Sequence, residues 1–276
     1  MLKLRIITAL IAAPIALMAA WKGSWIFTAL IAVLTIFGWR EFYRLLPFSK
    51  KPDLLKYLGG FLSLAIVIGA QCNLFFLPVE SIWIFGFLLL MSTIFILRDP
   101  KMMPLILTSF AGVTYVGIGF AQFIKVRNWG VVGIPEGGLI ILAMVVIGTW
   151  MNDSCAYFAG TLFGKRKLCP ELSPAKSWEG AIAGIIATVG TVLFIGTYFK
   201  LPYSVIALAS LGILIGIFGI IGDLVESGLK RWAGIKDSGQ FFPGHGGILD
   251  RTDSLLFVVP ATYVWLWISV LLQMIG

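Results

Sequence analysis

The chain has 276 residues, of which 59% are apolar and only 12% are charged, with 21 basic and 13 acidic side chains and a net charge of +8. A soluble domain holds about 25% charged residues, because it needs a polar surface around its core. The composition therefore excludes a soluble enzyme, a secreted disulfide scaffold and a disordered chain. The apolar runs are continuous, which excludes the alternating pattern of a transmembrane barrel. Three cysteines without paired spacing predict neither a disulfide framework nor a metal cluster.

Long apolar runs predict an all-α polytopic membrane protein, because a membrane-crossing helix needs about 20 mostly apolar residues. The runs indicate nine transmembrane helices, at residues 4–21, 24–46, 54–70, 81–97, 103–124, 138–163, 178–199, 203–230 and 252–275. The first run also resembles a signal peptide, but the spans behind it favour an uncleaved helix. We expect a single integral membrane domain over residues 1–276. Residues 1–130 are expected to be mainly scaffold, and residues 138–260 to carry the catalytic spans and loops.

The basic residues divide unevenly between the two sets of loops that nine spans define. Seventeen of the 21 Lys and Arg lie with the N-terminus and the loops on its side. The other set holds only Lys22, Lys125, Arg127 and Lys200. Because cytoplasmic loops carry the excess of Lys and Arg, the N-terminus is predicted to face the cytoplasm and the C-terminus the outside. The positive charge is attributed to an anionic membrane surface, so no nucleic-acid partner is expected.

Acidic residues occur within the predicted spans or at their ends, where a charge is costly. Asp153 lies inside the sixth span, and Asp223 and Glu226 lie near the cytoplasmic end of the eighth. Asp250 and Asp253 lie three residues apart at the start of the ninth. Carboxylates that converge at one membrane face form a hard-oxygen site of the kind that Mg²⁺ prefers. The pattern predicts a polar site facing the cytoplasm.

Structural roles remain open at two of these positions. Glu226 and Lys230 lie four residues apart and can form an ion pair along one helix face. Asn152 and Asp153 can form a polar plug between helices. Neither role covers the remaining aspartates, which outnumber the basic residues within reach of the bilayer.

The segment 227–253, SGLKRWAGIKDSGQFFPGHGGILDRTD, holds the densest chemistry in the chain. Adjacent glycines at its centre, Gly246 and Gly247, allow backbone N–H groups to turn toward an anion. Aspartates interleaved with basic side chains indicate a metal-bound polyphosphate rather than a purely topological loop. The only histidine, His245, either bonds the backbone or contacts substrate. The basic residues of the segment are Lys230, Arg231, Lys236 and Arg251.

A second polar patch lies between the sixth and seventh spans, over residues 165–167 and 173–180. Ser177 and Glu179 suit a helix N-terminus, where hydrogen-bond acceptors and negative charge are stabilised. Lys176 has no capping role at that position. It is therefore a candidate ligand for an anionic substrate.

The segment 227–253 resembles the signature of the phosphatidate cytidylyltransferases, also called CDP-diacylglycerol synthases. All the fixed positions of its 27 residues are met here, and they are Ser227, Leu229, Lys230, Arg231, Lys236, Asp237, Gly239, Phe242, Pro243, His245, Gly246, Gly247, Asp250, Arg251 and Asp253. Upstream, Asp153, Ser154, Ala156, Tyr157, Gly160, Gly164, Lys165 and residues 173–180 are also similar to the family. The resemblance is specific over about residues 150–260.

The resemblance implies an enzyme that uses CTP and phosphatidic acid to make CDP-diacylglycerol and pyrophosphate. It further implies that Asp223 and Asp250 bind Mg²⁺, that a monovalent cation such as K⁺ lies nearby, and that the protein is a homodimer. We expect a multi-pass protein of the bacterial inner or cell membrane, in contact with membrane lipid.

We assign the candidate site from these patterns. Catalytic roles are expected for Asp223, Lys230, Arg231, Asp250, Arg251 and Asp253. Substrate binding is expected for Asp153, Ser173, Lys176, Ser177, Ser227, Lys236, Asp237, His245, Gly246 and Gly247.

Two other functions compete with this one. In an ion-coupled transporter, Asp153 and Asp223 would be coupling carboxylates near the bilayer midplane, but here the carboxylates cluster toward one face and no inverted repeat is evident. A CTP-dependent lipid kinase would share CTP and Mg²⁺ but would release CDP instead of pyrophosphate. The products of the reaction distinguish the three.

Overall fold

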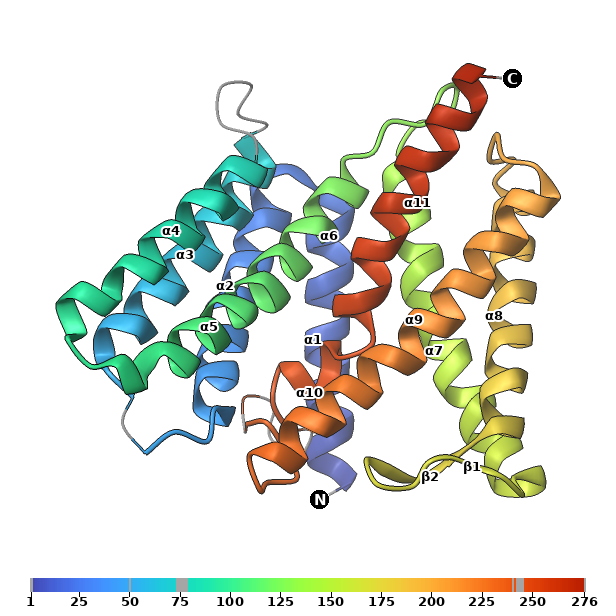
Figure 1. Ribbon diagram of the computed structural model, residues 1–276. Coiled ribbons are helices and arrows are strands. Elements are labelled where there is room, and N and C mark those ends of the chain that lie inside the picture. Colours follow the sequence, from blue (N-terminus) through green and yellow to red (C-terminus); the bar gives the residue numbers. More distant parts are fainter. Residues whose placement is uncertain (1, 50, 73–78, 240, 242–245, 276) are drawn as a thin grey trace. The chain divides into compact units, whose positions relative to one another are not determined.

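The computed structural model describes residues 2–49, 51–72, 79–239, 241 and 246–275. It consists of helices and one small hairpin of two strands (Figure 1). In chain order the elements are α1 (Leu2–Lys22), α2 (Ser24–Leu45), α3 (Asp53–Cys72), α4 (Val79–Leu97), η1 (Pro100–Met102), α5 (Met103–Gly112), η2 (Val113–Ile118), α6 (Gly119–Arg127), α7 (Gly137–Phe163), β1 (Lys167–Cys169), β2 (Ser173–Ser177), α8 (Trp178–Tyr198), α9 (Val205–Trp232), α10 (Leu249–Thr252) and α11 (Leu255–Ile275).

Seven helical stretches in the described part of the chain are long and apolar enough to cross a membrane. They are α2, α3, the run Pro100–Arg127, α7, α8, α9 and residues 255–272 of α11. This confirms the expected all-α polytopic membrane fold. Helices α1 and α4 occupy the first and fourth predicted spans, but the total of nine spans stays a prediction.

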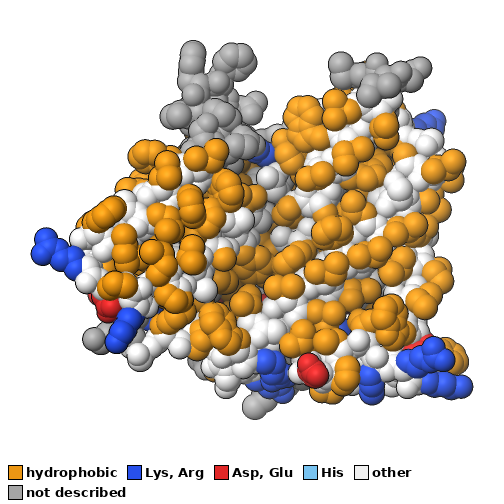
Figure 2. Space-filling model, viewed as in Figure 1, with side chains coloured by type: hydrophobic (Ala, Val, Ile, Leu, Met, Phe, Trp, Pro, Cys, Tyr) orange, Lys and Arg blue, Asp and Glu red, His pale blue; other side chains and the backbone are white. Residues whose placement is uncertain are grey.

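Large apolar side chains cover the outer surfaces of the helices, as Figure 2 shows. Phe95 is 80% exposed and Ile206 is 82% exposed. Lys and Arg side chains gather toward the ends of the helices in the same view (Figure 2). An exposed apolar surface of this extent indicates contact with another apolar phase. In a chain of membrane-spanning helices, that phase is the lipid of the bilayer.

The chain folds into two compact units that interleave along the sequence. The first unit consists of residues 1–125 and 229–251, and the second of residues 126–228 and 252–276. The chain therefore passes from the second unit back to the first inside α9, and leaves it again at the end of α10. Residues 229–251, which contain most of the signature, fold with the N-terminal half.

In the first unit, α2 packs closely on its neighbours through aromatic side chains. A Cβ on Gly59 of α3 or on Gly112 of α5 would overlap the rings of Trp39 and Phe42 respectively, so only glycine permits this approach. The Trp39 Nε1 donates to the carbonyl of Lys56 at 2.7 Å, which satisfies its one polar atom. The C-terminal end of α2 is thereby fixed against α3.

In the second unit, α7, α8 and α9 pack against one another, and Asn152 Nδ2 of α7 donates to the Gly216 carbonyl of α9 at 3.4 Å. A Cβ on Gly216 of α9 would lie 2.8 Å from the Ile185 side chain of α8, and one on Gly184 of α8 would lie 2.8 Å from the Asn152 carbonyl of α7. Small residues at such contacts let helix backbones approach where lipid supplies no hydrophobic driving force.

Three local features differ from the sequence-based expectations. The fifth predicted span is divided into η1, α5, the π-helical η2 and α6, and it is not one regular helix. The expected loop between the sixth and seventh spans contains the antiparallel pair β1 and β2. The ninth predicted span is preceded by the separate short helix α10, so α11 begins only at Leu255. Apolar length alone does not encode such breaks.

Candidate active site

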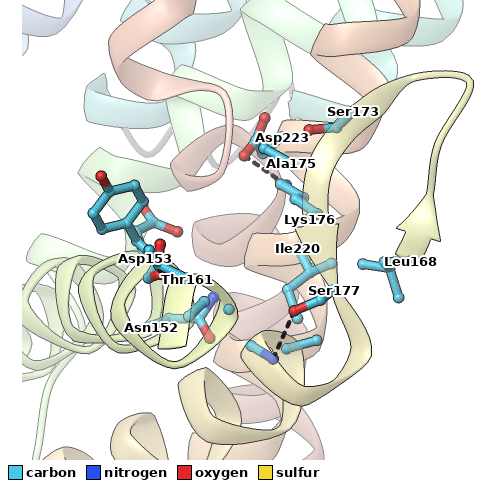
Figure 3. Close-up of a pocket in the computed structure, with 15 residues that line it drawn as sticks. Asn152, Asp153, Thr161, Leu168, Ser173, Ala175, Lys176, Ser177, Ile220 and Asp223 are labelled. Carbon is cyan, nitrogen blue, oxygen red and sulfur yellow. Dashed lines mark hydrogen bonds and ion pairs between the residues drawn. The ribbon is translucent and has the colours of Figure 1, made fainter. Parts of the chain in front are cut away.

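A pocket of about 290 Å³ in the second unit gathers residues from both upstream motifs and from α9. Helix α7 contributes Asn152 and Asp153, strand β2 contributes Ser173 and Lys176, and α9 contributes Asp223 (Figure 3). Asn152 and Asp223, the first and last of these residues, are 71 positions apart in the sequence. The fold therefore brings together two motifs that the sequence only suggested were related.

The charges in this unit leave the pocket with an excess of carboxylates. Lys176 Nζ lies 2.5 Å from Asp223 Oδ2, with the two side chains 24% and 33% exposed. The carboxylates of Asp253 and Asp223 repel that of Asp153, and Lys176 attracts it. Two carboxylates and one lysine therefore line the pocket, an arrangement that favours a further cation.

The hairpin before α8 determines the position of Lys176. Ser177 is the N-cap of α8, and its Oγ accepts a hydrogen bond from Gly180 N at 3.2 Å. This confirms the predicted helix start. The Glu179 carboxylate accepts hydrogen bonds from the backbone N–H groups of Lys165 and Arg166 at 3.1 and 3.3 Å. The cap and this carboxylate fix the strand that carries Lys176.

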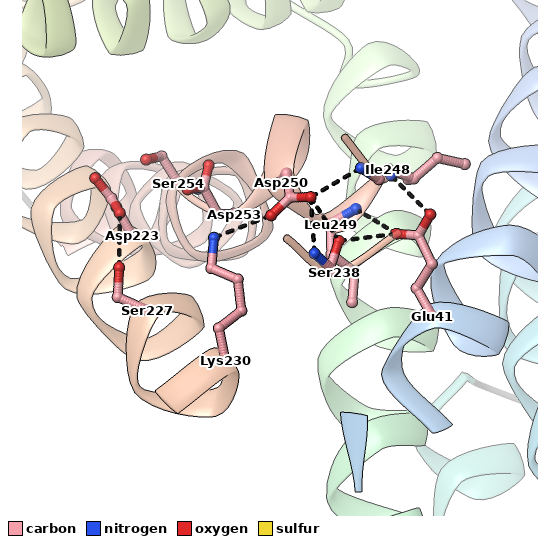
Figure 4. A network of polar contacts seen from close by, with 11 residues as sticks. Glu41, Asp223, Ser227, Lys230, Ser238, Ile248, Leu249, Asp250, Asp253 and Ser254 are labelled. Atoms are coloured by element: carbon pink, nitrogen blue, oxygen red, sulfur yellow. Dashed lines mark hydrogen bonds and ion pairs between the residues drawn. The ribbon is translucent and has the colours of Figure 1, made fainter. Parts of the chain in front are cut away.

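A second polar network lies in the first unit and is centred on Asp250 of α10 (Figure 4). Asp250 Oδ2 accepts from Ser238 N at 2.9 Å, from Ser238 Oγ at 3.0 Å and from Gly247 N at 2.8 Å. Asp250 Oδ1 accepts from Lys230 Nζ at 2.9 Å, with the two side chains only 8% and 16% exposed. Gly246, at φ +87°, turns the chain so closely that a Cβ would lie 2.6 Å from Asp250 Oδ2. Ser238, Gly246 and Gly247 therefore surround this carboxylate.

Glu41 of α2 belongs to the same network, although the sequence analysis did not single it out. Its Oε1 accepts from Ile248 N at 3.0 Å, and its Oε2 accepts from Leu249 N at 3.0 Å and from Ser238 Oγ at 3.2 Å. The residue is 5% exposed. The signal that identified Asp153, a carboxylate within an apolar predicted span, applied equally to this residue.

The C-terminal end of α9 presents the basic residues of the signature. Gly234, at φ +70°, ends the helix, and Ile235 N donates to the carbonyl of Lys230 at 3.0 Å. This is the pattern of a Schellman cap, which satisfies carbonyls that the helix leaves open. One turn earlier, Ser227 Oγ donates to Asp223 Oδ1 at 3.4 Å. The helix end is thus closed by the backbone, which leaves the lysine side chain for Asp250.

The other predicted residues lie on exposed surface or outside the described residues. Arg231 and Arg251 are exposed. Lys236 and Asp237, also exposed, line a hollow of about 430 Å³ together with Arg44 of α2. His245 lies outside the residues that the structure describes.

Comparison with known proteins decides the family. The sequence model of the cytidylyltransferase family matches residues 3–269. The chain belongs to the cytidylyltransferase family. A phosphatidate cytidylyltransferase of Bacillus subtilis (strain 168) is 35% identical over 265 residues, which are 95% of this chain and 96% of the relative. Proteins of the same name from Staphylococcus saprophyticus and Staphylococcus aureus (strain COL) are 33% and 32% identical, each over 94% of this chain and 96% of the relative.

The family membership confirms the resemblance carried by the signature, and the geometry divides the predicted site into two groups. Asp153, Ser173, Lys176, Ser177 and Asp223 line the pocket of the second unit. Lys230, Gly247 and Asp250 join the network of the first unit. The two predicted metal ligands, at positions 223 and 250, thus belong to different units. Each forms an ion pair with a lysine.

The carboxylates suit a hard divalent cation by the chemistry of their donors. Within the described ranges, no three metal-ligating side chains are close enough to hold an ion by themselves. Mg²⁺ does not need such a cluster, because it keeps several waters and binds through one or two carboxylates together with substrate phosphates. By this criterion one or two carboxylates, such as the predicted ligands Asp223 and Asp250, are sufficient protein ligands for such an ion.

Proposed function

We propose that this protein transfers CMP from CTP to phosphatidic acid, giving CDP-diacylglycerol and pyrophosphate. The observation that carries the proposal is the pocket of the second unit, in which Asp153 and Asp223 face Lys176 beside a capped helix start. The names of relatives 32–35% identical over nearly the whole chain support the same reaction.

The chemistry needs charge neutralisation rather than a general base. A phosphate monoester has a second pKa of about 6, so phosphatidic acid is largely a dianion at neutral pH and already a nucleophile. Its oxygen attacks the α-phosphorus of CTP, and the bond between that phosphorus and the bridging oxygen to the β-phosphate breaks. The electron pair of that bond leaves with pyrophosphate. Lysines 176 and 230 are suited to reduce the repulsion between the two anions.

We propose Mg²⁺ as the cofactor, held by Asp223 and Asp250, with a monovalent cation such as K⁺ nearby. When bound, Mg²⁺ neutralises the polyphosphate and stabilises the leaving group. For Asp250 Oδ1 to bind the ion, it would exchange its present partner, Lys230. Lys230 would supply positive charge for a substrate phosphate.

The remaining roles follow from position and charge. We propose that Arg231, Arg251 and Asp253 act with the carboxylates in catalysis. Substrate contacts are proposed for Ser173, Ser177, Ser227, Lys236, Asp237, His245, Gly246 and Gly247. Two anionic substrates, one soluble and one confined to the leaflet, meet most readily at the membrane face. We propose the cytoplasmic face, because 17 of the 21 basic residues belong to that side in a nine-span topology, and we propose a homodimer.

Analysis of the products tests this function against both competitors. Purified protein is given phosphatidic acid and CTP labelled on either the α- or the γ-phosphate. The proposal expects the α-label in a CDP-lipid and the γ-label in pyrophosphate. A lipid kinase would put the γ-label in the lipid and release CDP, and a transporter would consume no nucleotide. Either of these results would refute the proposal.

A further inference from the structure

The buried carboxylate of Glu41 lies at a point where two distant parts of the first unit meet. It projects from the C-terminal half of α2, and its three hydrogen-bond donors belong to residues 197 to 208 positions later in the chain. A carboxylate in a membrane-spanning helix is costly unless it is paired. Its environment therefore indicates a specific role in holding the signature segment.

The three hydrogen-bond donors to Glu41 come from the two ends of the segment 238–249, which leads up to Asp250. Ile248 N and Leu249 N are the backbone groups where α10 begins, immediately before Asp250 (Figure 4). Ser238 lies at the other end of the loop. Glu41 thus fixes the start of the short helix that carries the proposed metal ligand.

The Ser238 hydroxyl links the two carboxylates directly. It lies 3.2 Å from Glu41 Oε2 and 3.0 Å from Asp250 Oδ2. A hydroxyl carries one proton, so it donates to only one of the two carboxylates at a time. The hydrogen bonding of Asp250 therefore depends on Glu41 through this shared donor.

Two signature glycines give the Glu41 carboxylate its space. A Cβ on Gly239 or on Gly247 would overlap the carboxylate of Glu41. These two glycines of the signature therefore leave room for a residue that lies outside the signature.

We propose that Glu41 is a positioning residue for the proposed reaction: it orients Asp250 by holding the start of α10 and the Ser238 hydroxyl. The inference rests on the proposed function, because it gives Asp250 its role as a metal ligand. Glu41 touches neither substrate nor metal in this account.

The substitution Glu41→Gln tests the proposal with little change in size. Glutamine replaces one of the two acceptor oxygens with an NH₂ group, which then faces a backbone N–H and leaves that donor unsatisfied. Glu136→Gln is a matched control, since it removes a carboxylate that pairs with Arg127 at 2.7 Å in the other unit.

The first measurement does not depend on activity. Hydrogen exchange of the peptide covering residues 246–252 is followed without metal or substrate. We expect faster exchange of the Ile248 and Leu249 amides in Glu41→Gln and unchanged exchange in Glu136→Gln. Unchanged exchange in both variants would overturn the positioning role, whatever the enzyme makes.

The second measurement separates positioning from loss of folded protein. The Mg²⁺ concentration for half-maximal CDP-lipid formation is expected to rise about tenfold in Glu41→Gln, as when a partner of a metal ligand is removed. The KM for phosphatidic acid is expected to stay unchanged. A smaller amount of active enzyme would lower the rate but would not change the Mg²⁺ midpoint. An unchanged Mg²⁺ midpoint in Glu41→Gln would therefore refute the inference.

A second variant carries the test if Glu41→Gln does not fold. Ser238→Ala removes the shared hydroxyl but leaves the bonds from Glu41 to Ile248 and Leu249, and it too should raise the Mg²⁺ midpoint. A normal midpoint in Ser238→Ala would overturn the link to Asp250. If the wild type makes no CDP-lipid, the proposed function fails, while the exchange measurement still decides whether Glu41 orders the loop.

Discussion

Replacing Lys176 by alanine should impair turnover far more than it impairs folding. Lys176 pairs with Asp223, and the two side chains are 24% and 33% exposed. Solvent screens a pair with this much exposure, so its loss should lower the free energy of unfolding by about 1 kcal/mol or less. Removing a group that stabilises charge in the transition state costs about 10²–10³ in turnover. The loss of activity should therefore greatly exceed the loss of stability.

The assay compares three variants purified in the same detergent. Initial rates of CDP-lipid formation and thermal unfolding are measured for Lys176→Ala, Lys176→Arg and the control Lys167→Ala. Lys167 is an exposed residue on β1 of the same hairpin, so its loss removes one positive charge from that hairpin. Lys176→Arg should retain more activity than Lys176→Ala, because the charge remains while the geometry changes.

Two results would refute this reasoning. Near-normal turnover in Lys176→Ala would reduce its role to the neutralisation of Asp223. An equal loss of turnover in Lys167→Ala would show that total charge on the hairpin matters, and not the position of one lysine in the pocket.

The remaining predictions concern metal, topology and packing. Asp223→Asn and Asp250→Asn should each abolish CDP-lipid formation, and the double variant should be little worse because such groups act as a unit; near-normal turnover of either single variant at low Mg²⁺ would contradict the shared metal site. A reporter active only outside the cytoplasm should give signal when fused at the C-terminus and none when fused after Lys236, and the reverse result would contradict the proposed orientation. Gly222→Ala should lower the free energy of unfolding by about 1–3 kcal/mol, because its Cβ would lie 2.6 Å from the backbone just before α11. Gly190→Ala, which has nothing within 4 Å, is the control for thermal unfolding, and an equal effect in both would contradict the packing argument.

The fold and one half of the site follow from local patterns in the sequence. The predicted span at 138–163 matches α7 within one residue, and the predicted helix start at Ser177 is the N-cap of α8. Both depend on interactions within a few residues, namely apolar periodicity and capping. The sequence does not predict the pairing of Lys176 with Asp223, but it marks both residues as candidates because neither charge has a local structural role.

The interleaving of the two units and the role of Glu41 could not be predicted in this way. Glu41 and Leu249 lie 208 residues apart, and no local pattern links a carboxylate to backbone amides at that distance. The π-helical stretch η2 lies inside a continuous apolar run, so the hydropathy of the chain does not reveal it.

The return of the chain to its first unit has a consequence for biogenesis. Glu41 leaves the ribosome long before Ser238, Ile248 and Leu249, which supply its hydrogen bonds. At about 5–20 residues per second, synthesis of the intervening chain takes on the order of ten seconds or more. During this interval a nascent chain holds an uncompensated carboxylate in its second hydrophobic segment. The N-terminal helices therefore cannot complete their native packing as an independent early product, and a chain that stops before residue 229 should be a substrate for membrane quality control.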